Sequence, residues 1–231
     1  MDTHAARHGR ISRRALLRSA GVVAGAVGVT ALGAACAPSG APVAPAASLA
    51  PRPGGTLTFV RSTDAITLDP ANAGDLGGSG NTITMIFEGL VEYDPDLEVR
   101  PALATKWDVK DTVWTFTLRA GVKFHDGTPF NASAAKAHFD RLLGAEKPLR
   151  ANQWVPFVSK VEAVDESTLR FTTKFVDGYF LRRLADTSGY IMSPDAVKKS
   201  GKDISKNAVG TGPFKLVEWV KDDRITLARN D

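Results

Sequence analysis

The 231-residue sequence predicts a mixed α/β fold that contains antiparallel sheet. Within residues 101–130, apolar and polar side chains alternate over residues 114–119, so that Trp114, Phe116 and Leu118 fall on one face of a half-buried strand. Other segments space their apolar residues at i, i+3, i+4 and i+7, as one face of a helix does. Strands and helices follow one another in mixed order, which favours an α/β architecture with some antiparallel pairing.

The elements before this ribbon are short. Residues 56–61 are predicted to form a strand with Leu57 and Phe59 on one side. A turn at Asp69 and Pro70 and a glycine-rich loop over residues 74–80 come next. A helix follows, which Asn81 is expected to cap, and its apolar stripe is Ile83, Ile86, Phe87 and Leu90. Residues 91–93 begin a short strand that ends in the turn at residues 94–96.

The ribbon itself has two strands and tight turns. Trp107 and Val109 belong to its first strand, and the polar residues 110–112 turn the chain into the second. After Leu118 the chain passes Gly121 and the pair Asp126-Gly127, which favours a turn with positive φ.

Helices and ribbons alternate in the rest of the chain. Pro129 and Asn131 start a helix that Gly144 ends, and its apolar stripe is Ala134, Ala135, His138, Phe139, Leu142 and Leu143. A hairpin is predicted over residues 161–164 and 169–173, short helices over 180–184 and 195–199, and a last ribbon over 214–219 and 225–227. Gly210 and Gly212 before this ribbon are expected to adopt backbone angles that only glycine tolerates.

The run over residues 101–130, PALATKWDVKDTVWTFTLRAGVKFHDGTPF, resembles the family 5 extracellular solute-binding proteins, the receptors of bacterial ABC importers. Further matching segments follow in the same order: GGTLTF at 54–59, TLDP at 67–70, IFEGLVEYD at 86–94 and GTGPFKLVEW at 210–219. The resemblance implies lobe I of a type II periplasmic-binding-protein-like fold, built from residues 54–94 and 186–231, with residues 95–185 as an inserted antiparallel subdomain. Family members are more than twice as long, so the C-terminal lobe is expected to be missing.

The first 35 residues resemble a lipoprotein export signal. Residues 12–18, with Arg13 and Arg14, are similar to a twin-arginine motif, and the apolar run over residues 19–35 is shorter than the roughly 20 residues of a membrane span. Cys36, the single cysteine, follows small residues and by resemblance is a lipid attachment site, although Gly33 stands where leucine is usual. A weak anchor helix or a basic arm, and a free cysteine after an ordinary cleaved signal, are the alternatives. Residues 36–53 carry five prolines and are interpreted as a tether.

The charge distribution argues against nucleic-acid binding. The whole chain carries a formal charge of +4, and five arginines against Asp2 place all of it in residues 1–35. The remainder balances 24 basic against 24 acidic residues, and no basic stripe with interleaved aromatic residues occurs.

No set of residues in the sequence indicates catalysis, a metal or a cofactor. His125 and His138 are the only histidines after the signal, and no third ligand at suitable spacing accompanies them, so His125 is expected to steady a turn. The glycine-rich loop lacks the lysine of a phosphate loop. By resemblance, Gly74, Asp75 and Leu76 occupy a place that offers backbone groups to the ligand.

The sequence contains four tryptophans. Trp154 is predicted either to face the ligand cleft or to serve as core packing or a surface lid. Trp107, Trp114 and Trp219 occupy regular strand positions and are interpreted as core residues.

The resemblance implies a non-catalytic, substrate-binding component of an ABC importer for peptides or related solutes, acting as a monomer with the permease subunits as partners. The expected location is the outer face of the cytoplasmic membrane, through a lipid anchor. A surface lipoprotein that serves as an interaction module, or an inert remnant without transport function, is the alternative. Because the other lobe supplies most of the ligand contacts in such receptors, this chain alone is expected to bind weakly or not at all.

Overall fold

The computed structural model describes residues 54–231. The predicted signal peptide (1–35) with Arg13 and Arg14, and the predicted tether (36–53) with Cys36, lie outside the described residues. From the first helix onward, short helices and strands follow one another in the predicted order, and two separate hydrophobic clusters hold them together.

The first cluster lies under a four-stranded antiparallel sheet of strand order β3-β4-β6-β5. Its strands are β3 (Ala104–Lys110), β4 (Val113–Leu118), β5 (Val158–Ala163) and β6 (Thr168–Thr173). Trp114, Phe116 and Leu118 are buried on one face of β4, which confirms the period of two. β1 (Val91–Tyr93) and β2 (Val99–Pro101) form a separate antiparallel pair.

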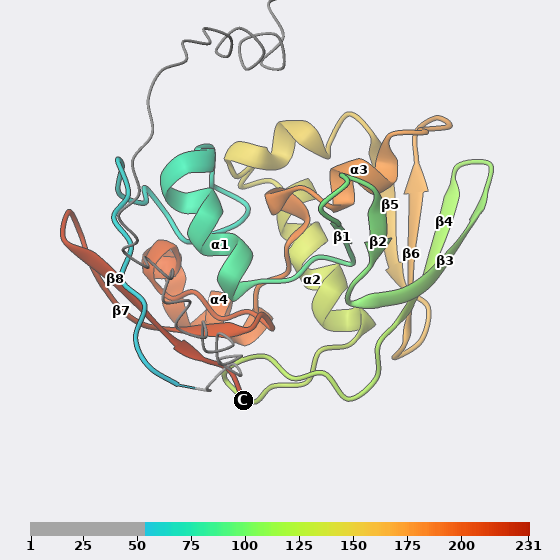
Figure 1. Cartoon of the computed structure of the whole chain (residues 1–231). Coiled ribbons are helices and arrows are strands. Elements are labelled where there is room, and N and C mark those ends of the chain that lie inside the picture. Colours follow the sequence, from blue (N-terminus) through green and yellow to red (C-terminus); the bar gives the residue numbers. More distant parts are fainter. Residues whose placement is uncertain (1–53) are drawn as a thin grey trace, which may run out of the picture. The chain divides into compact units, whose positions relative to one another are not determined.

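Helix α2 (Ala132–Leu143) packs against this sheet, and Figure 1 shows it between the sheet and the α1–α4 side of the fold. The Asn131 side chain caps the helix by accepting a hydrogen bond from the Ala134 N–H at 2.9 Å. Phe139 meets Phe171 of β6 edge to face with ring centroids 4.8 Å apart. The helix α3 (Phe180–Leu184) adds Phe180 and Leu184 to this cluster, and the short turn η2 (Leu149–Gln153) precedes Trp154, which also belongs to it.

The second cluster gathers α1 (Asn81–Ile86), α4 (Pro194–Ser200) and the two-stranded ribbon of β7 (Phe214–Val220) and β8 (Arg224–Arg229). The predicted stripe of Ile83, Ile86, Phe87 and Leu90 is fully buried, although the helix ends at Ile86. The 3₁₀ turns η3 (Thr187–Gly189) and η4 (Gly201–Lys206) flank α4 in the chain. Trp114 is buried as predicted, whereas Trp107 and Trp219 are only partly buried.

The predicted cap of α1 is wrong. A π-helical turn, η1 (Leu76–Gly80), runs directly into α1, so Asn81 is the first residue of α1 and its side chain donates to the Gly77 carbonyl at 3.2 Å. Asp75 provides the cap instead, since its carboxylate accepts from the N–H groups of Gly78 and Ser79. The glycine-rich segment is therefore part helix and only part loop.

The strand predicted over residues 56–61 is also wrong. These residues belong to no strand, and the side chains of Leu57 and Phe59 are 86% and 56% exposed. The alternation is present in the sequence, but a strand needs a neighbour, and no described strand pairs with this segment.

Gly210 and Gly212 are required for a reason other than the predicted one. Neither has a positive φ. A Cβ atom on Gly210 would lie 2.2 Å from the carbonyl oxygen of Ile86, and one on Gly212 would lie 2.7 Å from the same atom. These glycines therefore allow two backbone segments to pack in contact, which a side chain would prevent.

Within residues 54–231, none of the helices combines the length and the apolar character that crossing a membrane requires.

Candidate functional site

The turn that precedes the predicted ligand loop begins at a buried carboxylate. Asp69 is fully buried, and its carboxylate accepts hydrogen bonds from the Ala71 N–H at 3.1 Å and from the Asn72 side-chain amide at 2.7 Å. Arg141 of α2 donates to both of its carboxylate oxygens. The turn that leads into Gly74 is therefore fixed to α2.

The far end of the loop is fixed by Asp75. Its carboxylate accepts from the N–H groups of Gly78 at 2.9 Å and Ser79 at 2.6 Å. Burial opposes the negative charge, but the hydrogen bonds from Ser79 and Gly78 outweigh it and leave the pKa of the Asp75 carboxyl below its ordinary value. The side chain of Asp75, a predicted ligand residue, thus stabilises the loop through hydrogen bonds within it.

The buried residues behind Asp75 are also held firmly. The Ser79 hydroxyl accepts from the N–H groups of Ile66 and Thr67. The guanidinium of Arg61 donates to the Gly78 carbonyl at 2.6 Å and to the Thr82 hydroxyl at 2.7 Å. Loops with this many anchors present their exposed atoms in one arrangement, which lowers the entropy lost on binding.

The exposed part of the loop is centred on Gly74. Gly74 is exposed, and among residues 54–231 no backbone hydrogen bond to its N–H or C=O is present. Leu149, the first residue of η2, lies beside it: a Cβ atom on Gly74 would be 2.9 Å from a terminal methyl of Leu149. Leu149 is 61% exposed. Free backbone groups and an apolar side chain therefore share one surface. Of Leu76 the structure describes the backbone, which lies in η1.

Trp154 does not lie on this surface. Its side chain is 1% exposed, its indole N–H donates to the Ser188 hydroxyl at 3.2 Å, and its ring lies 5.0 Å from that of Phe139. This position favours core packing over a ligand contact. Trp154 also caps the C-terminal end of η2, where its backbone N–H donates to the Ala151 carbonyl.

His125 links two backbone segments. Its Nδ1 accepts from the Gly210 N–H at 3.3 Å, and its Nε2 lies 2.9 Å from the Gly212 carbonyl oxygen, so Nε2 carries the proton. Among the described residues, no three histidine, cysteine or acidic side chains are grouped as a metal site would need.

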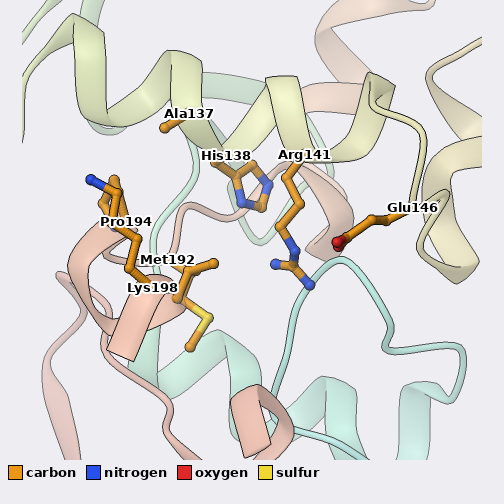
Figure 2. Close-up of a pocket in the computed structure, with 8 residues that line it drawn as sticks. Ala137, His138, Arg141, Glu146, Met192, Pro194 and Lys198 are labelled. Carbon is orange, nitrogen blue, oxygen red and sulfur yellow. The ribbon is translucent and has the colours of Figure 1, made fainter. Parts of the chain in front are cut away.

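A pocket of about 260 Å³ lies between α2 and α4. Figure 2 shows His138 and Arg141 projecting into it from α2, with Met192, Pro194 and Lys198 on the opposite side. None of the predicted ligand residues lines this pocket.

Comparisons with known proteins define the class of this fold. The solved structure of the ABC transporter-associated periplasmic binding protein DppA from Helicobacter pylori, in complex with the peptide STSA, matches with a TM-score of 0.64 and 30% identity, over 72% of this chain and 37% of that chain. NikA from Brucella suis, in complex with Fe(III)-EDTA, matches with a TM-score of 0.65 and 29% identity, over 73% of this chain and 34% of that one. The fold is therefore that of a periplasmic binding protein of type II.

The sequence comparisons name the family. The pattern of the bacterial extracellular solute-binding proteins, family 5 middle, matches residues 98–231. The glutathione-binding protein GsiB of Salmonella choleraesuis is 36% identical over 165 residues, which cover 71% of this chain and 32% of that protein. The chain belongs to family 5 of the bacterial extracellular solute-binding proteins, whose members act outside the cytoplasm. It matches about a third of the length of these relatives.

Sequence reasoning missed two parts of the site. Leu149 belongs to no periodic apolar pattern, so only its position beside Gly74 reveals it. The pair of Asp69 and Arg141 is separated by 72 positions, and neither residue alone predicts the other.

Proposed function

We propose that this chain takes part in capturing a peptide-like solute outside the cytoplasm and in delivering it to an ABC permease, without catalysis. The observation that carries the proposal is the exposed backbone of Gly74 beside the exposed side chain of Leu149, on a loop anchored at Asp69 and Asp75. The glutathione-binding and peptide-bound relatives support a peptide-like ligand, since glutathione is itself a modified tripeptide.

The physical argument follows from what the loop exposes. An extended peptide has unpaired N–H and C=O groups, and a loop whose own backbone groups are free can pair with them as an added strand does. Glycine at position 74 leaves this backbone uncovered, and Leu149 adds apolar surface for a side chain of the ligand. The ligand is thus expected to bind mainly through its main-chain groups, so this surface would accept ligands with different side chains.

We further propose that these residues supply one face of the ligand site and bind weakly alone. The match covers about a third of the relatives' length, and contacts on a single face leave much of a ligand in water. A dissociation constant of roughly 1 mM or weaker is expected. Export through Arg13 and Arg14 and lipid attachment at Cys36 complete the proposal, and they rest on the sequence pattern.

Backbone NMR of the full chain tests the site. Titration with reduced glutathione and with the tetrapeptide Ser-Thr-Ser-Ala is expected to shift the amide resonances of residues 74–77 and the methyl resonances of Leu149. The variant Gly74→Val covers the backbone and displaces Leu149, so it should abolish these shifts. Gly178→Val is the matched control, since a Cβ there meets no atom within 4 Å.

Three outcomes would contradict parts of the proposal. Micromolar affinity would show that the chain is a complete receptor. Shifts confined to another surface would move the ligand site elsewhere. No response to either ligand would favour the interaction-module alternative.

A further inference from the structure

The ion pair of Asp69 and Arg141 is largely buried. The Asp69 side chain is 0% exposed and that of Arg141 is 16% exposed. The carboxylate receives hydrogen bonds from Ala71, from Asn72 and from both terminal nitrogens of Arg141. A carboxylate in such a place depends on its cation, because removing one partner of a buried pair leaves an uncompensated charge.

The turn that begins at Asp69 also connects to Gly74 and Leu149, the two exposed residues of the proposed ligand surface. The Asn72 side-chain oxygen accepts from the Leu149 N–H at 2.9 Å, and the Ala71 carbonyl accepts from the Arg150 N–H at 3.0 Å. Two residues after Asn72 comes Gly74. One short segment therefore contacts α2 through Asp69 and η2 through Ala71 and Asn72.

Arg141 is placed to connect these parts. It projects from α2 beside His138 into the pocket between α2 and α4, as Figure 2 shows, and its charged end meets Asp69. Its own position is fixed by a long, regular helix that packs on the sheet. A rigid element therefore determines where the turn at Asp69 lies.

We propose that Arg141 is a positioning residue for the ligand surface: it acts through Asp69 to hold Gly74 and Leu149 side by side, an inference that rests on the proposed function for its role in binding. Arg141 itself forms no hydrogen bond or ion pair with Gly74 or Leu149. Losing it should loosen residues 71–80 while the sheet and α2 keep their packing.

A second buried pair offers a matched control. Arg183 and Asp177 have side chains 14% and 8% exposed, close to the values of the Asp69 pair. Arg183 donates to Asp177 and to the Gln153 carbonyl, and it lies over the ring of Phe157. It forms no hydrogen bond or ion pair with residues 69–80, so Arg183→Met removes a similar charge and leaves the hydrogen bonds of that loop in place.

Residue-resolved hydrogen exchange of the full chain tests the proposal. The amides of Asn72 and Ala73 donate to the Asp69 carbonyl, and those of Gly78 and Ser79 donate to Asp75, so all four report on the loop. Arg141→Met should raise their exchange rates about tenfold or more, with a smaller change in β4 and β6. Arg183→Met should raise exchange around α3 and leave these four amides near the wild-type rates.

Two milder variants keep the test decisive if Arg141→Met does not fold. Arg141→Lys keeps the charge but loses the two-point contact, and Asp69→Asn keeps the shape and loses the charge. Both should raise exchange at the four loop amides in the same direction. The proposal is overturned if the variants that fold leave these amides unchanged, or if Arg141→Met and Arg183→Met raise exchange equally over the whole chain.

The ligand titration separates this inference from the proposed function. If wild type responds to glutathione or Ser-Thr-Ser-Ala, Arg141→Lys should weaken binding at least about tenfold, and Gly178→Val, which changes a residue with open space around it, should not. If wild type responds to neither, the proposed function fails, and the exchange rates alone decide whether Arg141 positions the loop.

Discussion

The fold lowers the pKa of two histidines, His125 and His138. His138 of α2 is buried, and its Nε2 lies 3.1 Å from the Ser188 carbonyl oxygen, so the ring donates there. Burial lowers the pKa of His138 to about 4, and the neighbouring Arg141 adds to the shift. Burial also lowers the pKa of His125, whose Nδ1 must stay unprotonated to accept from Gly210.

These pKa values predict a loss of stability in mild acid. The unfolded chain, with histidine pKa values near 6.5, binds more protons than the folded chain once the pH drops below that value. The free energy of unfolding should therefore be highest above pH 6.5 and should decrease as the pH falls toward 4. The contribution of His138 to this decrease is roughly 3 kcal/mol.

Urea denaturation between pH 7 and pH 4.5 measures this loss. His138→Gln removes the titrating group and should flatten the decrease. Asp75 and Asp126 have pKa values below the ordinary 3.8, so their contributions are lost only in stronger acid, outside this range. An unchanged slope in His138→Gln would falsify the assignment.

At the scale of the element, the β3–β4 hairpin is strained at its turn. Lys110 pairs with Val113, which leaves a two-residue connection of Asp111 and Thr112. Asp111 has a φ of 56°, a left-handed conformation in which a Cβ atom crowds the backbone. Glycine would adopt it without strain.

Glycine is therefore expected to have opposite effects on the free energy of unfolding at the two adjacent positions of this turn. Asp111→Gly should raise the free energy of unfolding by roughly 0.5 kcal/mol or more, because strain is relieved. Thr112→Gly should lower it by a similar amount, because the φ of Thr112 is not positive and glycine only adds freedom to the unfolded chain. Thermal unfolding of both variants checks the signs, and a gain in both would contradict the strain argument.

Elements that depend on local pattern were predictable. The strands β4 and β6 have one buried and one more exposed face, so their sequences alternate, and α2 carries both its stripe and its cap at Asn131. The segment over residues 56–61 has the same alternation but no described partner strand, and periodicity cannot supply one. Three-residue β2 is too short to show a period.

The candidate site was less predictable, because its geometry depends on residues distant in sequence. Gly74 to Leu76 came from resemblance to a family, since free backbone groups leave no side-chain pattern. Leu149 and Arg141 join the site only through folding, and Trp154 is covered by Phe139 and Ser188 rather than facing outward.

At the scale of the whole molecule, the sequence before residue 54 predicts where the folded part acts. If Cys36 is acylated in a bacterial host, wild type should incorporate labelled fatty acid and sediment with membranes. Cys36→Ser should lose the label and appear in the soluble extracytoplasmic fraction, because the single attachment atom is gone.

The export motif gives an independent arm of this experiment. Arg13→Lys combined with Arg14→Lys should leave an unprocessed precursor inside the cell, with neither label nor export. Equal labelling of Cys36→Ser and wild type would rule out this cysteine as the lipid site, and normal export of the double lysine variant would rule out the twin-arginine route.

The β7–β8 ribbon has a practical consequence for anyone who purifies this chain. Among the described residues it consists of two strands only, so each strand keeps one margin without a hydrogen-bonded neighbour. Val217 on β7 is 61% exposed and Phe214 is 39% exposed. An open strand edge with exposed apolar side chains nearby can pair through backbone hydrogen bonds with a strand of another molecule. Concentrated stocks will therefore tend to gel or precipitate on storage, and dilute, low-temperature handling is the physically sound choice.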